Sequence, residues 1–246
     1  QEHERAIAIY DLIERNHFHG TRARNTANPV TMIDVVGGRR WIVRGNLIYD
    51  FQKALGDGIS YAAFLKGNSR DGLFERNLVM CTRNFSGGTR IGLSLGGGGT
   101  APQFCEEASC TTEHQNGILR NNLIVNCSDV GIYLNRAQDT LVDHNTLYAT
   151  AGIDVRFPTS SATLRNNALT SAIRNRDGGT STQSGNLANV ALATMQAWFQ
   201  DPANADFRAL DVAALVNQGA GGTAVIDDYC GDDRDDGLND IGAVEY

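Results

Sequence analysis

Polar and charged side chains alternate with apolar ones in six short segments of this chain. Lys66 closes one such segment, and Asn135, Arg156 and Arg176 close three later ones. The position two residues earlier in these segments is taken by Asp34, Ser94, Tyr133, Asp154 and Arg174. Arginine can grip a carboxylate or sulfate with two hydrogen bonds, and tyrosine offers a stacking face and a hydroxyl. The set suits the binding of an anionic sugar chain.

Lys66 is the residue of this set best suited to proton transfer. A lysine can act as a base when burial or neighbouring cations lower its pKa. Arg136 directly follows Asn135 at the end of a later segment. We therefore expect Lys66, Tyr133 and Arg136 to be catalytic, and we expect Ser94, Asn135, Asp154, Arg156, Arg174 and Arg176 to bind the substrate.

These segments must be strands, because their apolar residues recur with period two. Ile132, Leu134, Ile153 and Val155 would then point inward, and the polar residues between them would point outward. If the strands stack at about 4.8 Å, successive outward residues form columns. The candidate residues would share two adjacent columns on one face.

A second repeat carries an asparagine between two apolar pairs and sets the architecture. The six aligned residues are Asn16, Asn46, Asn77, Asn122, Asn145 and Asn167. Such an asparagine suits an internal ladder in which each side-chain amide bonds the next. Strands this short need stacked neighbours, so we predict an all-β, right-handed parallel β-helix of about six coils. A barrel or sandwich is disfavoured, since Asn-Gly hairpin turns do not separate the strands.

The domain prediction follows from where the repeats stop. Residues 1–188 would form the β-helix, with an insertion loop at about 96–116, and residues 189–246 a capping helix and tail. Helical apolar spacing in 189–200 predicts a short helix that closes the last coil. The chain opens inside a repeat, so we expect residues upstream of Gln1. His144, next to a ladder asparagine, is expected at the surface.

Composition excludes several function classes. The net charge of −7 disfavours nucleic acid, which needs clustered cations. No apolar run approaches the roughly 18 residues of a membrane span. We expect a monomer.

The five cysteines favour an exported protein, secreted or held in the periplasm or at the cell surface. Cys81 and Cys127 follow the asparagine ladder at nearly equal offsets, which predicts a disulfide or two stacked thiols. Cys105 and Cys110 lie five residues apart in the insertion. With His114 they offer three zinc ligands, but a small disulfide loop is the favoured interpretation. Cys230 is left over.

The repeats resemble the PbH1-type repeats of bacterial secreted parallel β-helix proteins. The ending, FQDPANADFRAL followed by DDYCGDDRDDGLNDIGAVEY, resembles the tail that often closes such proteins. This resemblance concerns the fold, which supports lyases, hydrolases, epimerases and adhesins alike.

A more distant resemblance is to the polysaccharide lyase family of chondroitinase B and some alginate lyases. The segment Phe64-Leu65-Lys66-Gly67-Asn68-Ser69 is similar to that family's lysine motif. The resemblance implies β-elimination from a uronate glycan, with Lys66 as base, an arginine as acid, and calcium held by asparagine and glutamate. This chain departs from the pattern, because Gly96 replaces the arginine and Asp57 is the only acidic residue near the expected glutamate pair.

Calcium is therefore the cofactor that we consider, although the sequence requires none. Its candidate ligands are the insertion carboxylates of Glu106, Glu107 and Glu113, with the acidic stretch 227–236 as a further candidate.

Two other functions stay open beside the lyase. One is a non-catalytic carbohydrate-binding or cell-surface module. The other, placed third, is a glycoside hydrolase, which needs two facing carboxylates. Asp34 and Asp154 share a column but lie several coils apart. Which glycan is bound is left open.

Overall fold

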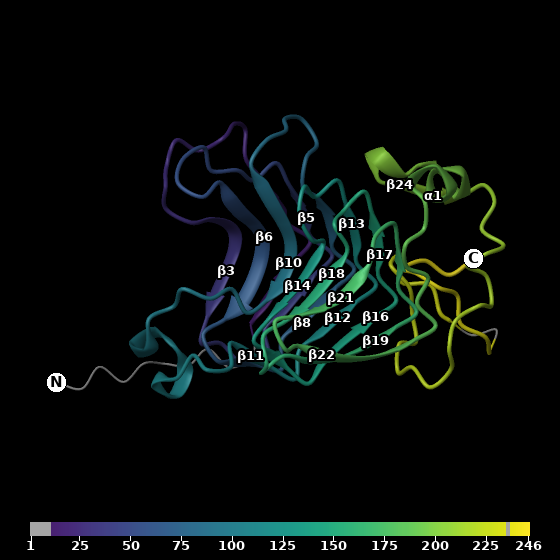
Figure 1. Cartoon of the computed structure of the whole chain (residues 1–246). Helices are drawn as coiled ribbons and strands as arrows, with labels where there is room; N and C mark the ends of the chain where they lie inside the picture. The colour runs from purple at the N-terminus through teal and green to yellow at the C-terminus, as the bar shows by residue number, and fades with distance from the viewer. Residues whose placement is uncertain (1–10, 235–236) are drawn as a thin grey trace.

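Three parallel sheets wind around one core in the computed structural model of the protein, which describes residues 11–234 and 237–246 (Figure 1). Most coils place one strand in each sheet, and each strand pairs with its equivalent in the neighbouring coils. The predicted parallel β-helix is confirmed. Residues 1–10 of the predicted β-helix domain, and Asp235 and Asp236 of the acidic stretch, lie outside the described residues.

The strands of the three sheets are short because each coil turns three corners. Sheet 1 contains β1 (Leu12–Glu14), β4 (Ile42–Arg44), β8 (Leu73–Glu75), β12 (Ile118–Arg120), β16 (Thr140–Asp143), β19 (Ser161–Arg165) and β22 (Thr180–Ser184). Sheet 2 contains β2 (His17–His19), β5 (Leu47–Tyr49), β9 (Leu78–Met80), β13 (Leu123–Val125), β17 (Thr146–Tyr148) and β20 (Ala168–Leu169). Sheet 3 contains β3 (Val30–Val36), β6 (Ile59–Lys66), β10 (Thr89–Leu95), β14 (Ile132–Asn135), β18 (Ile153–Arg156) and β21 (Ile173–Arg176).

Smaller elements complete the chain. A three-stranded sheet bridges sheets 3 and 1 with β7 (Ser69–Arg70), β11 (His114–Gln115) and β15 (Ala137–Gln138). The insertion contains 3-10 turns at Pro102–Phe104 and Glu106–Ala108. The tail contains α1 (Leu192–Trp198), the antiparallel pair β23 (Phe199–Asp201) and β24 (Asp206–Ala209), and a 3-10 turn at Pro202–Asn204. No helix among the described residues is long and apolar enough to cross a membrane.

The asparagine ladder forms as predicted and has one further rung. Asn122 Oδ1 accepts from the Nδ2 of Asn77 at 3.0 Å, and Asn122 Nδ2 donates to Asn145 Oδ1 at 2.9 Å. The same contact repeats up to Asn167, whose Nδ2 donates to Asn186 Oδ1 at 2.8 Å. The ladder holds the corner between sheets 1 and 2, because each amide also bonds backbone carbonyls there. Asn186 escaped the sequence analysis since no apolar pair precedes it.

Sheet 1 carries an outward column of alternating charge. Its members, each two residues before a ladder asparagine, are Glu14, Arg44, Glu75, Arg120, Asp143 and Arg165. Glu75 is buried between Arg120 at 2.7 Å and Arg44 at 3.4 Å. Because each cation meets an acid of a neighbouring coil, these charges neutralise one another. Sheet 1 therefore offers little free charge to a ligand.

The tail packs against the outward face of sheet 2 rather than over the last coil, and Figure 1 shows it to the right of the coils. Met195 and Trp198 of α1 pack with Met80, Leu123, Val125 and Tyr148, which point outward from sheet 2. The expectation that the helix closes the last coil is thus wrong. The outward face of sheet 2 is apolar, and burying it against the tail is more favourable than leaving it in water.

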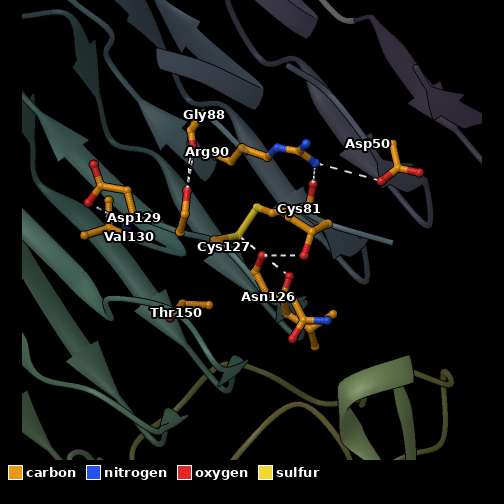
Figure 2. Close-up of a disulfide and its surroundings, with 12 residues drawn as sticks. Asp50, Cys81, Gly88, Arg90, Asn126, Cys127, Asp129, Val130 and Thr150 are labelled. Atoms are coloured by element: carbon orange, nitrogen blue, oxygen red, sulfur yellow. Dashed lines mark hydrogen bonds and ion pairs between the residues drawn. A yellow bond between two sulfur atoms is a disulfide. The ribbon is translucent and has the colours of Figure 1, made fainter. Parts of the chain in front are cut away.

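A disulfide joins Cys81, after β9, to Cys127, after β13, as one of the two sequence interpretations predicts (Figure 2). The fully buried Arg90 of β10 donates to the carbonyl of Cys81, and its guanidinium lies 3.8 Å from Asp50. The disulfide and Arg90 together tie the end of sheet 2 to the start of sheet 3. This linkage fixes the strand that lies at the centre of the candidate site.

Candidate functional site

The outward face of sheet 3 brings the candidate residues into two adjacent columns. The first column, in coil order, contains Asp34, Phe64, Ser94, Tyr133, Asp154 and Arg174. The second contains Val36, Lys66, Gly96, Asn135, Arg156 and Arg176. The period-two pattern thus placed each residue in its column, although Phe64 was overlooked as a member of the first.

Lys66 turns back from its own column toward the first. Its Nζ lies 4.4 Å from the centre of the Phe64 ring, and Phe64 pairs with Asp34 in the next coil. Lys66 forms no ion pair within 4 Å among the described residues. A Cβ at Gly97 would lie 3.2 Å from Lys66 Cδ, so the glycine run of the insertion passes directly against the lysine stem. Lys66 is half-buried and its ammonium is not neutralised by a salt bridge.

Aromatic rings form a platform beside Lys66. The rings of Tyr61 and Phe64 meet edge to face with centres 5.4 Å apart, and Tyr133 packs with the outward Ile91 and Val130 of the same patch. Burial raises the pKa of Tyr61, so its phenol keeps its proton at neutral pH. Tyr61 and Phe64 were missed, although both lie at outward positions of β6, because β6 bends at Ala62 and Ala63, which are both buried in the core.

Arg156 and Arg136 flank the aromatic ring of Phe157. Each guanidinium carbon lies 4.8 Å from the centre of that ring. Arg156 also donates to the Tyr133 hydroxyl at 3.2 Å and to Asp177. Arg156 is therefore held at the edge of the platform, where a substrate carboxylate can replace part of its bonding. Arg136, proposed as catalytic, stacks on Phe157 at the end of the coil, and no contact within the described part of the chain connects it to Lys66.

Several predicted substrate-binding residues are already bonded to other groups of the protein. Arg174 and Arg176 each bond one oxygen of Asp154 at 2.6 Å, and Asp154 is almost completely buried. Ser94 is fully buried, and its hydroxyl donates to the carbonyl of Tyr133 at 3.0 Å. The expectation that Ser94 and Asp154 face a ligand is therefore corrected, because the larger side chains of neighbouring coils cover both.

Asn135 has one unsatisfied group next to this face. Its Oδ1 is buried without a hydrogen-bond partner, and a Cβ at Gly98 would lie 3.7 Å from its Nδ2. A buried acceptor without a donor costs free energy. Asn135 thus keeps a free acceptor beneath the glycine run.

The insertion is closed by the predicted Cys105–Cys110 disulfide. Each of its three candidate calcium ligands already has a partner: Arg39 pairs with Glu106 and, at 3.7 Å, with Glu107, which also pairs with Arg70 at 2.6 Å. Glu113 accepts from the amide of Gly67 at 2.9 Å. No group of three metal-ligand side chains includes them among the described residues. This donor set does not fit a calcium ion, and the carboxylates instead attach the insertion to the coils.

The two histidines nearest these elements are structural. His114 is fully buried, with Nδ1 2.6 Å from the Ser69 hydroxyl, and burial lowers its pKa to about 3. His144 was expected at the surface but is fully buried between Asp143 at 2.8 Å and Asn166 at 3.1 Å. The tail covers this corner, since Thr223 bonds Asp143 and Ala220 bonds Asn166.

The acidic tail brings Asp228, Cys230 and Asp232 together, with ligand atoms within 4.8 Å of one another. The oxygens of buried Asp228 already accept from three backbone amides, those of Gly231, Asp232 and Glu245. Cys230 is a free, exposed thiol. The Asp228 bonds order the turn, which leaves this group as a structural feature of the tail.

Comparisons with known proteins agree with the fold. The family model described as "Periplasmic copper-binding protein (NosD)" matches residues 104–191, well under half of the chain. The crystal structure of pectate lyase Pel9A is similar with a TM-score of 0.55 and 16% sequence identity. The alignment covers 97% of this chain and 66% of that one, so this protein spans just under two thirds of its length. No curated protein matches.

The segment that matches the NosD model does not offer copper ligands. Its cysteines, Cys105, Cys110 and Cys127, are all in disulfides. Its histidines, His114 and His144, are buried and hydrogen-bonded. These residues do not fit a copper ion, so the match describes the β-helix repeat and carries no copper chemistry to this chain.

Proposed function

We propose that the protein binds an anionic polysaccharide along the outward face of sheet 3 and cleaves it by β-elimination at Lys66. The β-helix fold and its similarity to a pectate lyase structure support a role in polysaccharide chemistry. We also infer that the protein acts outside the cytoplasm, because its two disulfides are typical of oxidising compartments.

The observation that carries this proposal is the position of the Lys66 ammonium. It lies over an aromatic ring on the sheet face and has no salt bridge. In the same two columns, the cations Arg174 and Arg176 are bonded to Asp154. Lys66 is therefore the cation that can exchange a proton with a bound sugar without first breaking an ion pair.

The neighbouring side chains supply the binding. The partly exposed ring of Tyr61 can stack on a pyranose ring, with the buried rings of Phe64 and Tyr133 supporting it from beneath. Arg156 at the platform edge can grip a uronate carboxylate with two hydrogen bonds. A sugar chain lying along the stack would cross successive coils and meet these groups in turn.

A non-catalytic carbohydrate-binding module is the second candidate. It is favoured by the pairing of Asp154 with Arg174 and Arg176, which neutralises three of the charged groups on the face. The two candidates share the binding surface and differ only in whether Lys66 moves a proton.

The test incubates the protein with alginate, pectate and chondroitin sulfate, with calcium and with a chelator, and follows the ultraviolet absorbance of unsaturated uronates. We expect absorbance to grow on at least one polymer and to fall at least about 100-fold in Lys66→Met, the usual loss for a proton-transfer group. Arg208→Gln removes an exposed tail cation and serves as the matched control. Retarded migration in polymer-containing gels without any absorbance change would favour the binding module instead.

A further inference from the structure

Asp34 and Lys66 are both neighbours of Phe64 on the outward face of sheet 3. Asp34 is on β3, directly opposite Phe64 of β6, and the Lys66 ammonium lies over the Phe64 ring. Asp34 is an exposed carboxylate at the first coil of the platform, and Lys66 is close enough to act on its charge. An acid and a base therefore stand side by side on one sheet face, within the site of the proposed function.

The surroundings set the protonation of this pair. Desolvation raises the pKa of Asp34, and the ammonium of Lys66 opposes that rise. From β6 the only other titratable group on this side is the phenol of Tyr61; beyond Gly37, Arg39 is paired with Glu106. Both the π face of Phe64 and the Asp34 carboxylate stabilise a cation. Asp34 is therefore a more basic carboxylate than an ordinary aspartate, and it stands beside a cation that the Phe64 ring holds.

We propose that Asp34 is the base and Lys66 the acid of an elimination carried out on one face of the sugar ring. This inference rests on the proposed function and assigns the roles within it. It also reverses the role that the lyase resemblance implies for Lys66, because in this assignment Lys66 donates a proton instead of abstracting one.

The step balances without a further reactant. The Asp34 carboxylate takes the proton from C5, next to the uronate carboxyl group. The electron pair of that C–H bond forms the C4–C5 double bond, and the C4–O4 bond breaks. Lys66 gives its proton to O4, so the products are an unsaturated uronate and a chain with a free hydroxyl. Water later restores the two protonation states by exchanging the proton from Asp34 to Lys66.

The geometry selects the substrate. Asp34 and Lys66 both project from sheet 3, so both would approach the same face of a sugar ring that lies on this sheet. The chain segment that lies against Lys66 from the insertion is the glycine run 96–99, which carries no side chain to act from the other side. A same-face elimination requires the C5 hydrogen and O4 on one side of the ring. Mannuronate and glucuronate meet this condition, whereas galacturonate and guluronate do not.

The first experiment compares four polymers by absorbance of the unsaturated product: polymannuronate, a glucuronan, polyguluronate and polygalacturonate. We expect kcat/KM on polymannuronate or the glucuronan to exceed that on the other two by at least about 100-fold. Cleavage of polyguluronate or polygalacturonate at a higher rate would overturn the Asp34–Lys66 pair and leave the lyase function intact. If all four polymers stay intact, the proposed function fails and this inference fails with it.

The second experiment separates the roles by variants and pH on the best polymer. We expect Asp34→Asn to lose at least about 100-fold in kcat with little change in KM, and Asp211→Asn, on the exposed tail, to keep wild-type activity. Arginine cannot act as a base but can hold a positive charge at O4, so Lys66→Arg should keep at least about 10-fold more activity than Lys66→Met.

The pH profile completes the test. If Asp34 is the base, activity rises with pH as the Asp34 carboxyl group loses its proton and then stays level. In Asp34→Asn the rising limb should disappear from the residual activity. Activity that climbs steadily through the alkaline range, or equal loss in Lys66→Arg and Lys66→Met, would show that Lys66 is the base and overturn the assignment. Thermal melting of each variant confirms that it is folded.

Discussion

His114 illustrates how a single buried group makes this protein sensitive to acid. Its imidazole is fully buried beside Ser69, and desolvation lowers its pKa to about 3 from an ordinary value near 6.5. Below about pH 6.5 the unfolded chain binds a proton at the His114 imidazole, whereas the folded chain binds none there until the pH falls to about 3. The free energy of unfolding therefore falls by about 1.4 kcal/mol per pH unit between about pH 6.5 and 3 because of this group.

We expect His114→Gln to remove that part of the pH dependence. The stability advantage of the wild type over the variant should shrink by about 2 kcal/mol between pH 7 and pH 5, measured by urea unfolding. His17→Gln, which changes an exposed histidine, is the control and should follow the wild type. Parallel pH curves for wild type and His114→Gln would contradict this account of His114.

The candidate site shows what can be predicted residue by residue. The period-two pattern placed Lys66, Asn135 and Arg156 in one column, because alternation alone decides which side chains point outward. It could not predict that Ser94 is buried or that Asp154 bonds two arginines. Those outcomes depend on side chains from neighbouring coils, whose sizes and reach the pattern does not specify.

At the scale of elements, the asparagine ladder is the device that aligns the coils. The side chain of a middle rung such as Asn122 bonds rungs on both sides and two carbonyls. Among the described contacts, the side-chain amide of Asn16 reaches only Asn46 and the carbonyl of Glu14. Asn122 is fully buried and Asn16 is exposed. The two residues therefore differ in how many buried groups lose a partner when the amide is removed.

We expect Asn122→Ala to lower the free energy of unfolding by about 3 kcal/mol, because several buried donors and acceptors lose their partners. Asn16→Ala should cost below about 1 kcal/mol, since water can replace its amide. Denaturant unfolding followed by circular dichroism measures both. Equal losses would mean that the ladder acts as a set of independent contacts and that burial does not set its strength.

The charged column of sheet 1 was within reach of the sequence and was overlooked. Each member lies two residues before a ladder asparagine, so the ladder alignment also aligns Glu14, Arg44, Glu75, Arg120, Asp143 and Arg165. Alternating sign down this column was visible once the asparagines were aligned. Because the charges of sheet 1 are already paired with one another, this column supports the proposal that a ligand binds at sheet 3.

At the scale of the whole molecule, the tail covers an apolar face that the coils leave open. Phe199, Phe207, Leu215 and Ile241 of the tail pack with the outward residues of sheet 2. The tail also crosses the corner beside the asparagine ladder, where Asp227 bonds Asn121 and Arg76. The tail is therefore a lateral cover whose contacts span several coils.

We expect a chain ending at residue 188 to expose Met80, Leu123, Val125 and Tyr148 and to self-associate. Light scattering and binding of a hydrophobic dye should both increase relative to the full chain. A double variant of this shorter chain, Leu123→Lys with Val125→Lys, should reduce both signals. A monomeric 188-residue chain that does not bind the dye would show that the coils do not need this cover.

By itself, the sequence determined the stacked coils, the asparagine ladder, the closeness of Cys81 to Cys127 and the two outward columns of sheet 3. All of these follow from local periodicity and from offsets counted along the chain, which stacking converts directly into neighbours. Only the tertiary structure decided where the tail packs, which arginines are already neutralised, and that Lys66 turns toward Phe64. Those features depend on contacts between side chains of different coils, where size, burial and the competition between partners choose among arrangements that share the same sequence pattern.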